Sequence, residues 1–200
     1  MKILFATTNP AKVSKYKKRL EEHGIELLTV RDLDFSLDID ENGKNALENA
    51  RLKAKAYYEK TRTPTIGMDN NLFIEELAEA EQPGTHVKRI NGRELSDEEM
   101  IAYYVDLVHR YGGRLTAKWV YGMVICGDNG VREFSWSHDH FYLVEEPSEK
   151  RTVGYPLDSI SVDPGTGTYF VDLDERGNTK YDDGREIENV VEFIVDSVSG

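Results

Sequence analysis

The first thirty residues alternate between the pattern of a buried strand and that of an amphipathic helix. The apolar run at residues 3–6 predicts a strand, and a helix should follow with Asn9 as its N-cap and Pro10 in its first position. Residues 25–30 predict a second strand. A strand that leads into a helix and then into another strand is typical of a sheet covered by helices. This opening therefore favours an α/β protein.

Three more helices are predicted from apolar residues at helical spacing. The first begins near Lys44 or Asn45 and ends at about Lys60, and the second begins at the capping box of Ser96 and Glu99. The third closes the chain. Their buried faces are expected to comprise Ala46, Ala50, Ala54 and Tyr57; Met100, Ile101, Tyr104, Leu107 and Val108; and Ile187, Val190, Val191, Ile194, Val195 and Val198.

The strand pattern changes in the second half of the chain. Residues 65–68 predict a strand that ends in a turn at residues 69–71. Alternating apolar residues then predict a long antiparallel hairpin, followed by two further strands. Their expected ranges are 115–126 and 131–144 for the hairpin, then 159–162 and 169–173. The prediction is a mixed α/β fold, and without a repeat or linker the chain is expected to be one domain over residues 1–200.

The composition excludes several classes of function. A net charge of −12 argues against a nucleic acid polymer as partner, because phosphate backbones require a basic face. No apolar run approaches the roughly 20 residues that span a bilayer, and residues 1–6 are too short for a signal peptide, so no membrane partner is expected. The single cysteine, Cys126, excludes an internal disulfide and a cysteine-based zinc site. The predicted location is the cytoplasm.

The turn between the first strand and the first helix is a candidate phosphate site. Helix N-termini present N–H groups and a positive dipole end, both of which favour anions. Hydroxyls of Thr7 and Thr8, the amide of Asn9 and the ammonium of Lys12 suit phosphate oxygens. The alternative is that Asn9 only caps the helix and Lys12 is solvated. Taken alone, this turn favours the alternative.

Carboxylates near the second helix and the third strand are candidate metal ligands. Glu41 and Glu48 flank a glycine turn and a helix start, Lys53 lies about one turn beyond Glu48, and Asp69 follows an apolar strand. Ligands of α/β sheets bind at the ends of such strands. Magnesium takes oxygen ligands, often one or two carboxylates plus substrate phosphates, and Glu41 with Asp69 would supply them. Ordinary helix ion pairs and a turn cap at Asp69 are the alternatives.

The order and spacing of these motifs resemble one family, the inosine triphosphate pyrophosphatases, which hydrolyse non-canonical purine nucleoside triphosphates such as ITP, dITP and XTP. The resemblance covers residues 1 to about 100. It implies an elongated α/β protein with a central sheet and two lobes, a site in the cleft between the lobes, and a homodimer. The motifs that carry it are Thr8-Asn9 with Lys12, Glu41-x-Gly43, Glu48-Asn49-Ala50-x-x-Lys53-Ala54, the turn at Asp69, and Pro83-Gly84 with Arg89.

The resemblance also implies roles for individual residues. Glu41 would bind Mg²⁺. Asp69 matches the second acid of the family's paired-aspartate turn, and would bind the metal or activate the water that attacks the α-phosphorus. Products would be a nucleoside monophosphate and pyrophosphate. The substrate's triphosphate would be held by Thr8, Asn9, Lys12 and Lys53.

The chain departs from the family at several positions. The usual Asp-Asp-Ser-Gly is replaced by residues 68–71, Met-Asp-Asn-Asn, so one acid and a permissive glycine are absent. Lys15 stands where the family has a glutamate. The base-recognition run appears only as residues 153–158, where Tyr155 would stack on a base and Asp158 would accept a hydrogen bond from it. The family's Ser-His-Arg motif is absent, and residues 180–185, which fall in its region, are acidic.

Three functions therefore stay open from the sequence. The first is a divergent family member that hydrolyses nucleoside triphosphates, with non-canonical purines as the first expectation. The second is a related pyrophosphatase acting on modified pyrimidines or other nucleotides, which the altered residues 151–185 favour. The third is a nucleotide-binding protein that has lost catalysis, for which Met68 is the best support.

Overall fold

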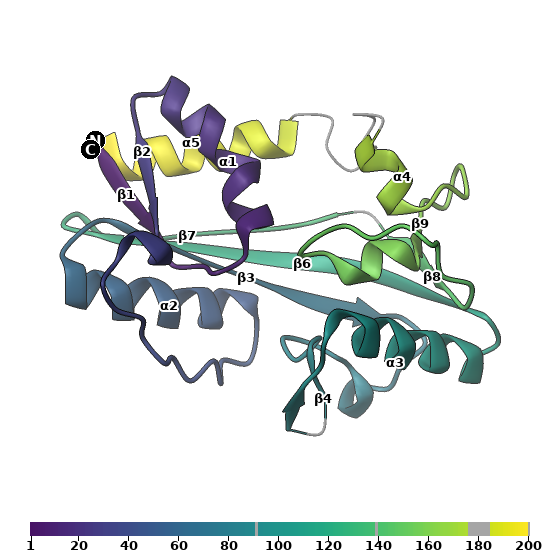
Figure 1. Cartoon of the computed structure of the whole chain (residues 1–200). Coiled ribbons are helices and arrows are strands. Elements are labelled where there is room, and N and C mark those ends of the chain that lie inside the picture. Colours follow the sequence, from purple (N-terminus) through teal and green to yellow (C-terminus); the bar gives the residue numbers. More distant parts are fainter. Residues whose placement is uncertain (91, 139, 176–184, 200) are drawn as a thin grey trace. The chain divides into compact units, whose positions relative to one another are not determined.

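The computed structural model describes residues 1–90, 92–138, 140–175 and 185–199, which form an α/β fold with a mixed sheet and flanking helices (Figure 1). The chain divides into two compact units, each described here by itself. Strands β3 (Thr65–Ile74) and β6 (Arg114–Gly127) contribute residues to both. The first unit comprises Met1–Asn70, Tyr121–Trp136 and Gly184–Gly200, and the second comprises Asn71–Val120 and Ser137–Asp183.

The sheet of the first unit is built around the N-terminal strand. β1 (Lys2–Phe5) pairs in parallel with β2 (Glu26–Thr29) on one side and with β3 on the other. The strand order continues from β3 to β6 and then to β7 (Gly130–Ser137). β1 ends at Phe5, opposite Ile66, whereas β3 continues to Ile74. The predicted phosphate turn follows β1, and Asp69 lies within β3, three residues beyond the point where β1 ends.

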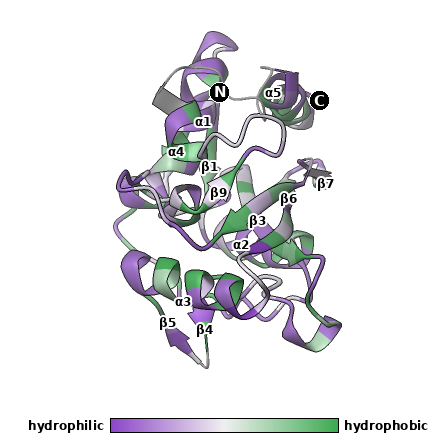
Figure 2. Ribbon diagram, turned by 90° about the vertical axis from the view of Figure 1, so that its right-hand side faces the viewer, coloured by the Kyte–Doolittle hydropathy of each residue, from purple (hydrophilic) through white to green (hydrophobic). Residues whose placement is uncertain are grey.

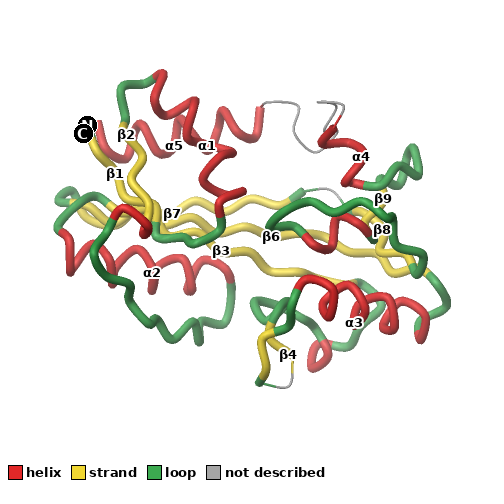
Figure 3. Tube along the Cα trace, in the orientation of Figure 1, coloured by secondary structure: helices red, strands yellow, loops and turns green. Residues whose placement is uncertain are grey.

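Helices cover both faces of this sheet (Figure 3). α1 (Pro10–Glu22) and α5 (Arg185–Ser199) lie on one face, where Tyr16, Leu20 and Ile194 pack with the apolar side chains of β1 and β3. α2 (Ala46–Thr61) lies on the other face, and its buried Ala50 and Ala54 pack against β6. The predicted apolar face of α2 is therefore confirmed, and four of the six residues predicted for α5 are buried.

α2 begins at an asparagine N-cap and ends at a residue in the left-handed conformation. Asn45 Oδ1 accepts a hydrogen bond from Glu48 N at 3.0 Å, which caps the helix start, and Arg62 ends the helix in the left-handed conformation at φ 56°. Two glycines let this helix approach the sheet closely. A Cβ at Gly67 of β3 would lie 1.9 Å from Ala50 O, and one at Gly122 of β6 would lie 2.6 Å from Leu47 N. Side chains at these positions would push α2 away from the sheet.

The second unit packs α3 (Asp97–Arg110) against β6, β8 (Phe141–Val144) and a 3₁₀-helix (Pro156–Ser159). The capping box of Ser96 and Glu99 is confirmed, as is the predicted apolar stripe of α3. Hydrophobic and hydrophilic residues alternate along this helix in Figure 2. Smaller elements complete the second unit: a hairpin of β4 (Arg89–Ile90) and β5 (Arg93–Glu94), β9 (Ser161–Val162), and the 3₁₀-helix Glu79–Glu81. The first unit has a further 3₁₀-helix, Val30–Asp32. None of the described helices is long and apolar enough to cross a membrane.

Three local predictions were wrong. Residues 69–71 do not turn: β3 continues to Ile74, because Leu72 exchanges backbone hydrogen bonds with Gly84 at 3.0 and 3.2 Å and extends the pairing. The predicted strand 169–173 is instead α4 (Phe170–Glu175), whose Phe170 packs on Phe141 at a ring distance of 5.1 Å. The second arm of the long hairpin is divided into β7 and β8.

Candidate active site

The β1–α1 turn carries the first group of predicted site residues. Asn9 caps α1 as predicted, with Oδ1 accepting from Ala11 N at 2.9 Å, and its own N–H donates to Thr7 Oγ1 at 3.2 Å. Thr8 is exposed in the same turn, and its side chain makes no hydrogen bond within the described part of the chain. The turn therefore holds its shape through Thr7 and Asn9 and presents the Thr8 hydroxyl to solvent.

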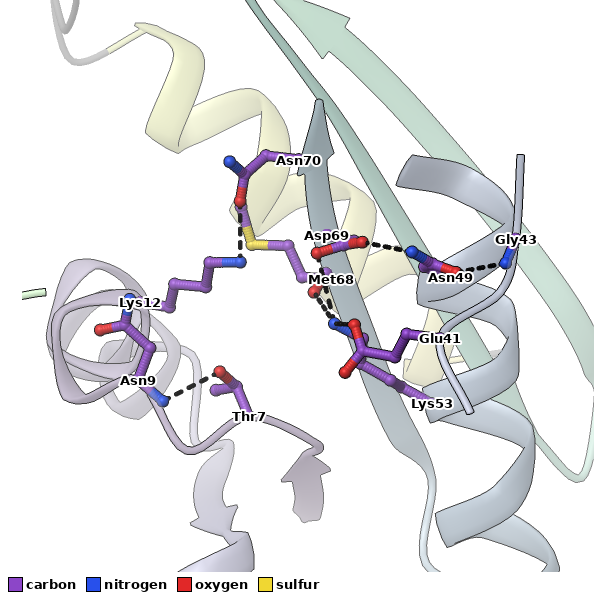
Figure 4. A network of polar contacts seen from close by, with 10 residues as sticks. All are labelled: Thr7, Asn9, Lys12, Glu41, Gly43, Asn49, Lys53, Met68, Asp69 and Asn70. Carbon is purple, nitrogen blue, oxygen red and sulfur yellow. Dashed lines mark hydrogen bonds and ion pairs between the residues drawn. The ribbon is translucent and has the colours of Figure 1, made fainter. Parts of the chain in front are cut away.

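Lys12 extends from the first turn of α1 to the middle of β3. Its Nζ donates to Asn70 Oδ1 at 3.1 Å, a neutral partner (Figure 4). Burial, together with repulsion by Lys53, lowers the pKa of Lys12 from its ordinary value of 10.5 to about 8, although the nearby Asp69 and Glu41 act to raise it. Lys12 is thus a positioned cation whose hydrogen-bond partner is neutral.

Lys53 joins the two predicted metal ligands. Its Nζ lies 2.7 Å from Glu41 Oε2 and 3.3 Å from Asp69 Oδ1, and it also donates to Met68 O at 3.4 Å. The side chains of Lys53 and Asp69 are each 13% exposed, whereas Glu41 is 41% exposed. Water therefore screens the Lys53–Asp69 pair less than the contact with Glu41. Both carboxylates therefore contact the same Lys53 ammonium group (Figure 4).

Asn49 is a site residue to which the sequence analysis gave no role. It is 1% exposed, and its carboxamide accepts from Gly43 N at 2.8 Å and donates to Asp69 Oδ2 at 2.9 Å. One signal was present in the sequence: Asn49 lies on the small-residue face of α2, between Ala46 and Ala50. A polar residue on a buried helix face needs a hydrogen-bond partner.

Successive residues of β3 point to opposite faces of the sheet. Asp69 faces α2, where it meets Asn49 and Lys53, whereas Asn70 faces Lys12 of α1. Met68 shares the α1 side and is 4% exposed within the apolar cluster of that face. The position at which the resemblance expects a first acid is therefore filled by a core side chain.

The donor set fits a magnesium ion that is shared with a phosphate. Glu41 and Asp69 supply carboxylate oxygens that already converge on one cation, the Lys53 ammonium. The described residues hold no group of three or more His, Cys, Asp or Glu side chains that could bind a metal ion. Magnesium is commonly bound by one or two carboxylates together with substrate phosphates and water, so two carboxylates suffice.

A model of the Ham1 family matches residues 3–182 of this chain. The protein belongs to the Ham1 family. A dITP/XTP pyrophosphatase of Aquifex aeolicus is 31% identical over 205 residues, covering 97% of this chain and 96% of that protein. One of Leptospira interrogans, also named dITP/XTP pyrophosphatase, is 28% identical over 174 residues and 86% of each chain. The resemblance to inosine triphosphate pyrophosphatases is thus confirmed.

A solved structure shows the same fold as this Ham1-family chain. The Staphylococcus aureus Ham1 protein superimposes with a TM-score of 0.77 at 20% identity, covering 98% of this chain and 99% of that one. The predicted α/β class is confirmed by this likeness and by the strand order.

The remaining predicted site residues of this Ham1-family chain belong to the second unit. Tyr155 is the N-cap of the 3₁₀-helix Pro156–Ser159 and Asp158 lies within that helix. Both are half-buried, and Asp158 N donates to Tyr155 O at 3.1 Å. Their predicted roles in base binding stay predictions. The acidic segment 180–185 falls where the family carries its Ser-His-Arg motif. Residues 180–184 of this segment lie outside the described residues, and Arg185 is the first residue of α5.

Proposed function

We propose that this protein hydrolyses nucleoside triphosphates to a monophosphate and pyrophosphate, with non-canonical purine nucleotides such as dITP, XTP and ITP as its substrates. One observation carries the proposal: two lysines and two carboxylates gather around Asp69 and Asn70 of β3, just beyond the carboxyl end of β1. Lys53 contacts both Glu41 and Asp69, and Lys12 reaches Asn70 of the same strand. The curated relatives named dITP/XTP pyrophosphatase, which match up to 97% of the chain, support the substrate class.

The lysines and the turn would bind the triphosphate. The N–H groups at the start of α1, the hydroxyl of Thr8 and the Asn9 side chain belong to a helix N-terminus, where an anion is favoured. Lys12 and Lys53 would add positive charge, which stabilises the negative charge that develops on leaving pyrophosphate. Because Lys12 is bonded to a neutral amide rather than to a carboxylate, its charge is available to a phosphate.

Asp69 would act on the attacking water. Its Oδ2 is held by Asn49 and its Oδ1 by Lys53, so the carboxylate has a fixed orientation and keeps further lone pairs for a water proton. Glu41 and Asp69 would hold Mg²⁺, which when bound supplies charge neutralisation and polarises phosphoryl oxygens. In this proposal Asp69 is the catalytic residue.

Base recognition is proposed for the second unit. The Tyr155 ring would stack on the base and Asp158 would accept a hydrogen bond from it. We extend the proposal to a cytoplasmic homodimer, as the resemblance implies. The buried, unpaired thiol of Cys126 agrees with a reducing compartment, and sedimentation velocity measures the subunit number.

A substrate panel distinguishes the proposed function from the two alternatives. The protein is incubated with Mg²⁺ and, separately, dITP, XTP, ITP, the four common nucleoside triphosphates and modified pyrimidine triphosphates, and pyrophosphate is quantified. Preference for dITP, XTP or ITP supports the proposal. Preference for a pyrimidine keeps the chemistry and replaces the substrate.

Absence of pyrophosphate from every nucleotide would favour a binding protein that has lost catalysis. In that case Met68→Asp, which restores an acid beside Asp69, is expected to produce metal-dependent turnover where the wild type has none. An active wild type excludes this function directly.

A further inference from the structure

Asn49 links two parts of the site that are distant in sequence. It lies in the first turns of α2, and its side chain is buried to 1% exposure between the loop that carries Glu41 and strand β3. Gly43 N donates to its Oδ1 at 2.8 Å, and its Nδ2 donates to Asp69 Oδ2 at 2.9 Å. A single carboxamide therefore joins the Glu41 loop to Asp69.

The chemistry of the two neighbours determines how the carboxamide lies. A backbone N–H can only donate, and an ionised carboxylate can only accept. The oxygen of Asn49 must therefore face Gly43 and its nitrogen must face Asp69. Aspartate has no donor for Asp69 when it is ionised, and leucine has neither group. Asparagine meets both requirements at this length.

The loop is shaped to reach Asn49. A Cβ at Gly43 would lie 2.6 Å from Asn49 Oδ1 and 2.8 Å from Asn49 N, so only glycine lets the backbone approach the helix this closely. The neighbouring Lys44 N donates to Glu48 Oε2 at 2.9 Å, which is a second hydrogen bond between the same loop and α2. Glu41 lies two residues before Gly43. Its distance from Asp69 is therefore set partly through Asn49.

We propose that Asn49 is a positioning residue that orients the Asp69 carboxylate and holds the Glu41 loop against it. It touches neither phosphate nor metal, and it acts through Asp69. With Asn49 on Oδ2 and Lys53 on Oδ1, both carboxylate oxygens are fixed, which sets the direction of the remaining lone pairs. The inference rests on the proposed pyrophosphohydrolase function for its kinetic consequence.

The kinetic test separates the two hydrogen bonds of Asn49. Asn49→Asp keeps an oxygen for the Gly43 N–H but turns a carboxylate oxygen, instead of a donor, toward Asp69. Replacing groups that orient metal-site ligands costs about 10–100-fold, so kcat for dITP at saturating Mg²⁺ should fall by that factor. KM should stay close to the wild-type value, because Asn9 and Lys12 are untouched.

A matched variant on the same helix is the control. Asn45→Asp makes the same chemical change four residues earlier, keeps a cap oxygen for Glu48 N, and should retain wild-type kcat. Wild-type kcat in Asn49→Asp would show that only the contact with Gly43 matters, and would overturn the proposal. A fall in kcat in Asn45→Asp equal to that in Asn49→Asp would overturn it as well.

A second measurement needs no activity. Urea midpoints in metal-free buffer are compared for Asn49→Ala, Asp69→Ala and the double variant. Side chains in contact give non-additive changes, whereas independent side chains give additive ones. Non-additive midpoints support the link between Asn49 and Asp69, and additive midpoints overturn it. If Asn49→Ala does not fold, the cycle is repeated with Asn49→Ser, which adds no charge beside Asp69.

The two measurements distinguish this inference from the proposed function. A wild-type protein that releases no pyrophosphate but gives non-additive midpoints would contradict the function and leave the link intact. An active protein with additive midpoints would contradict the link alone.

Discussion

Replacing Gly67 by alanine tests how closely α2 must approach the sheet. The added Cβ would lie 1.9 Å from Ala50 O and 2.8 Å from Ala54 N, both backbone atoms of a helix that cannot adjust one at a time. Carbon and oxygen in ordinary contact are about 3.5 Å apart, so the helix must retreat by about 1.5 Å. The retreat also loosens the packing of Ala50 and Ala54 against Val124.

Overpacking of this kind typically costs about 1–3 kcal/mol. Because the added Cβ meets two backbone atoms of α2, we expect Gly67→Ala to lie at the upper end of this range, about 3 kcal/mol. For a chain of this length the melting temperature should fall by about 6–12 °C. Asn49 and Lys53 move with α2, so kcat for dITP should fall too. Urea unfolding followed by circular dichroism gives the free energy, and thermal scans give the melting temperature.

Gly127→Ala is the matched control for this prediction. Its Cβ would meet Pro64 Cβ at 3.8 Å, an ordinary contact, and the substitution should change stability by no more than about 0.5 kcal/mol. Equal stability of Gly67→Ala and Gly127→Ala would refute the argument that the contact between α2 and β3 requires glycine.

Three further perturbations test individual site residues. Lys12 has a pKa of about 8 in the fold against an ordinary 10.5, so its positive charge is lost as pH rises through 8; KM for dITP should rise between pH 8 and 10, and Lys12→Arg should remove that rise. Between pH 8 and 10 Lys12 stays protonated in the unfolded chain but loses its proton in the fold, so its contribution makes the free energy of unfolding increase with pH. Urea titrations of wild type and Lys12→Arg at pH 8 and 10 test the direction of this change. Asp69→Asn should lower kcat by about 10²–10⁴-fold with the fold intact, and retained activity would contradict its assignment. Lys53→Met removes the cation that Glu41 and Asp69 contact, and should destabilise the metal-free protein by about 1–3 kcal/mol. Added Mg²⁺ should raise the melting temperature of this variant more than that of the wild type. An equal rise in both proteins would count against a metal site at these carboxylates.

Local signals predicted most of the helices. Asn9 with Pro10, Asn45, and the pair Ser96 and Glu99 each place a hydrogen-bonding cap where a helix begins, and all three starts agree with the structure. The apolar faces followed from spacing alone, because a helix buries residues three and four apart.

Elements decided by distant contacts were not predictable in this way. Residues 69–71 have the composition of a turn, yet they stay extended, and Asn49, Lys53 and Lys12 contact the side chains of Asp69 and Asn70 from other elements. Residues 169–171, Tyr-Phe-Val, are strand-forming types, but residues 170–175 form a helix whose Phe170 packs on Phe141. In both segments tertiary contacts outweigh weak local preference.

The site, too, contains residues that local sequence signals predict and residues whose roles depend on distant contacts. Glu41, Lys53 and Asp69 were predicted as one group, and the structure brings them within hydrogen-bond or ion-pair distance. The partner of Lys12, Asn70, could not be found from sequence, because it depends on α1 and β3 sharing one face of the sheet. The position of Met68 in the core likewise follows from which face of β3 meets α1 and α5.

The most direct measurement follows the oxygen of the attacking water. The protein is incubated with Mg²⁺ and dITP in ¹⁸O-labelled water, and the products are separated and analysed by mass spectrometry. Attack at the α-phosphorus predicts one labelled oxygen in dIMP and unlabelled pyrophosphate. Label in pyrophosphate, or release of single phosphate with dIDP, would contradict the proposed reaction at this site.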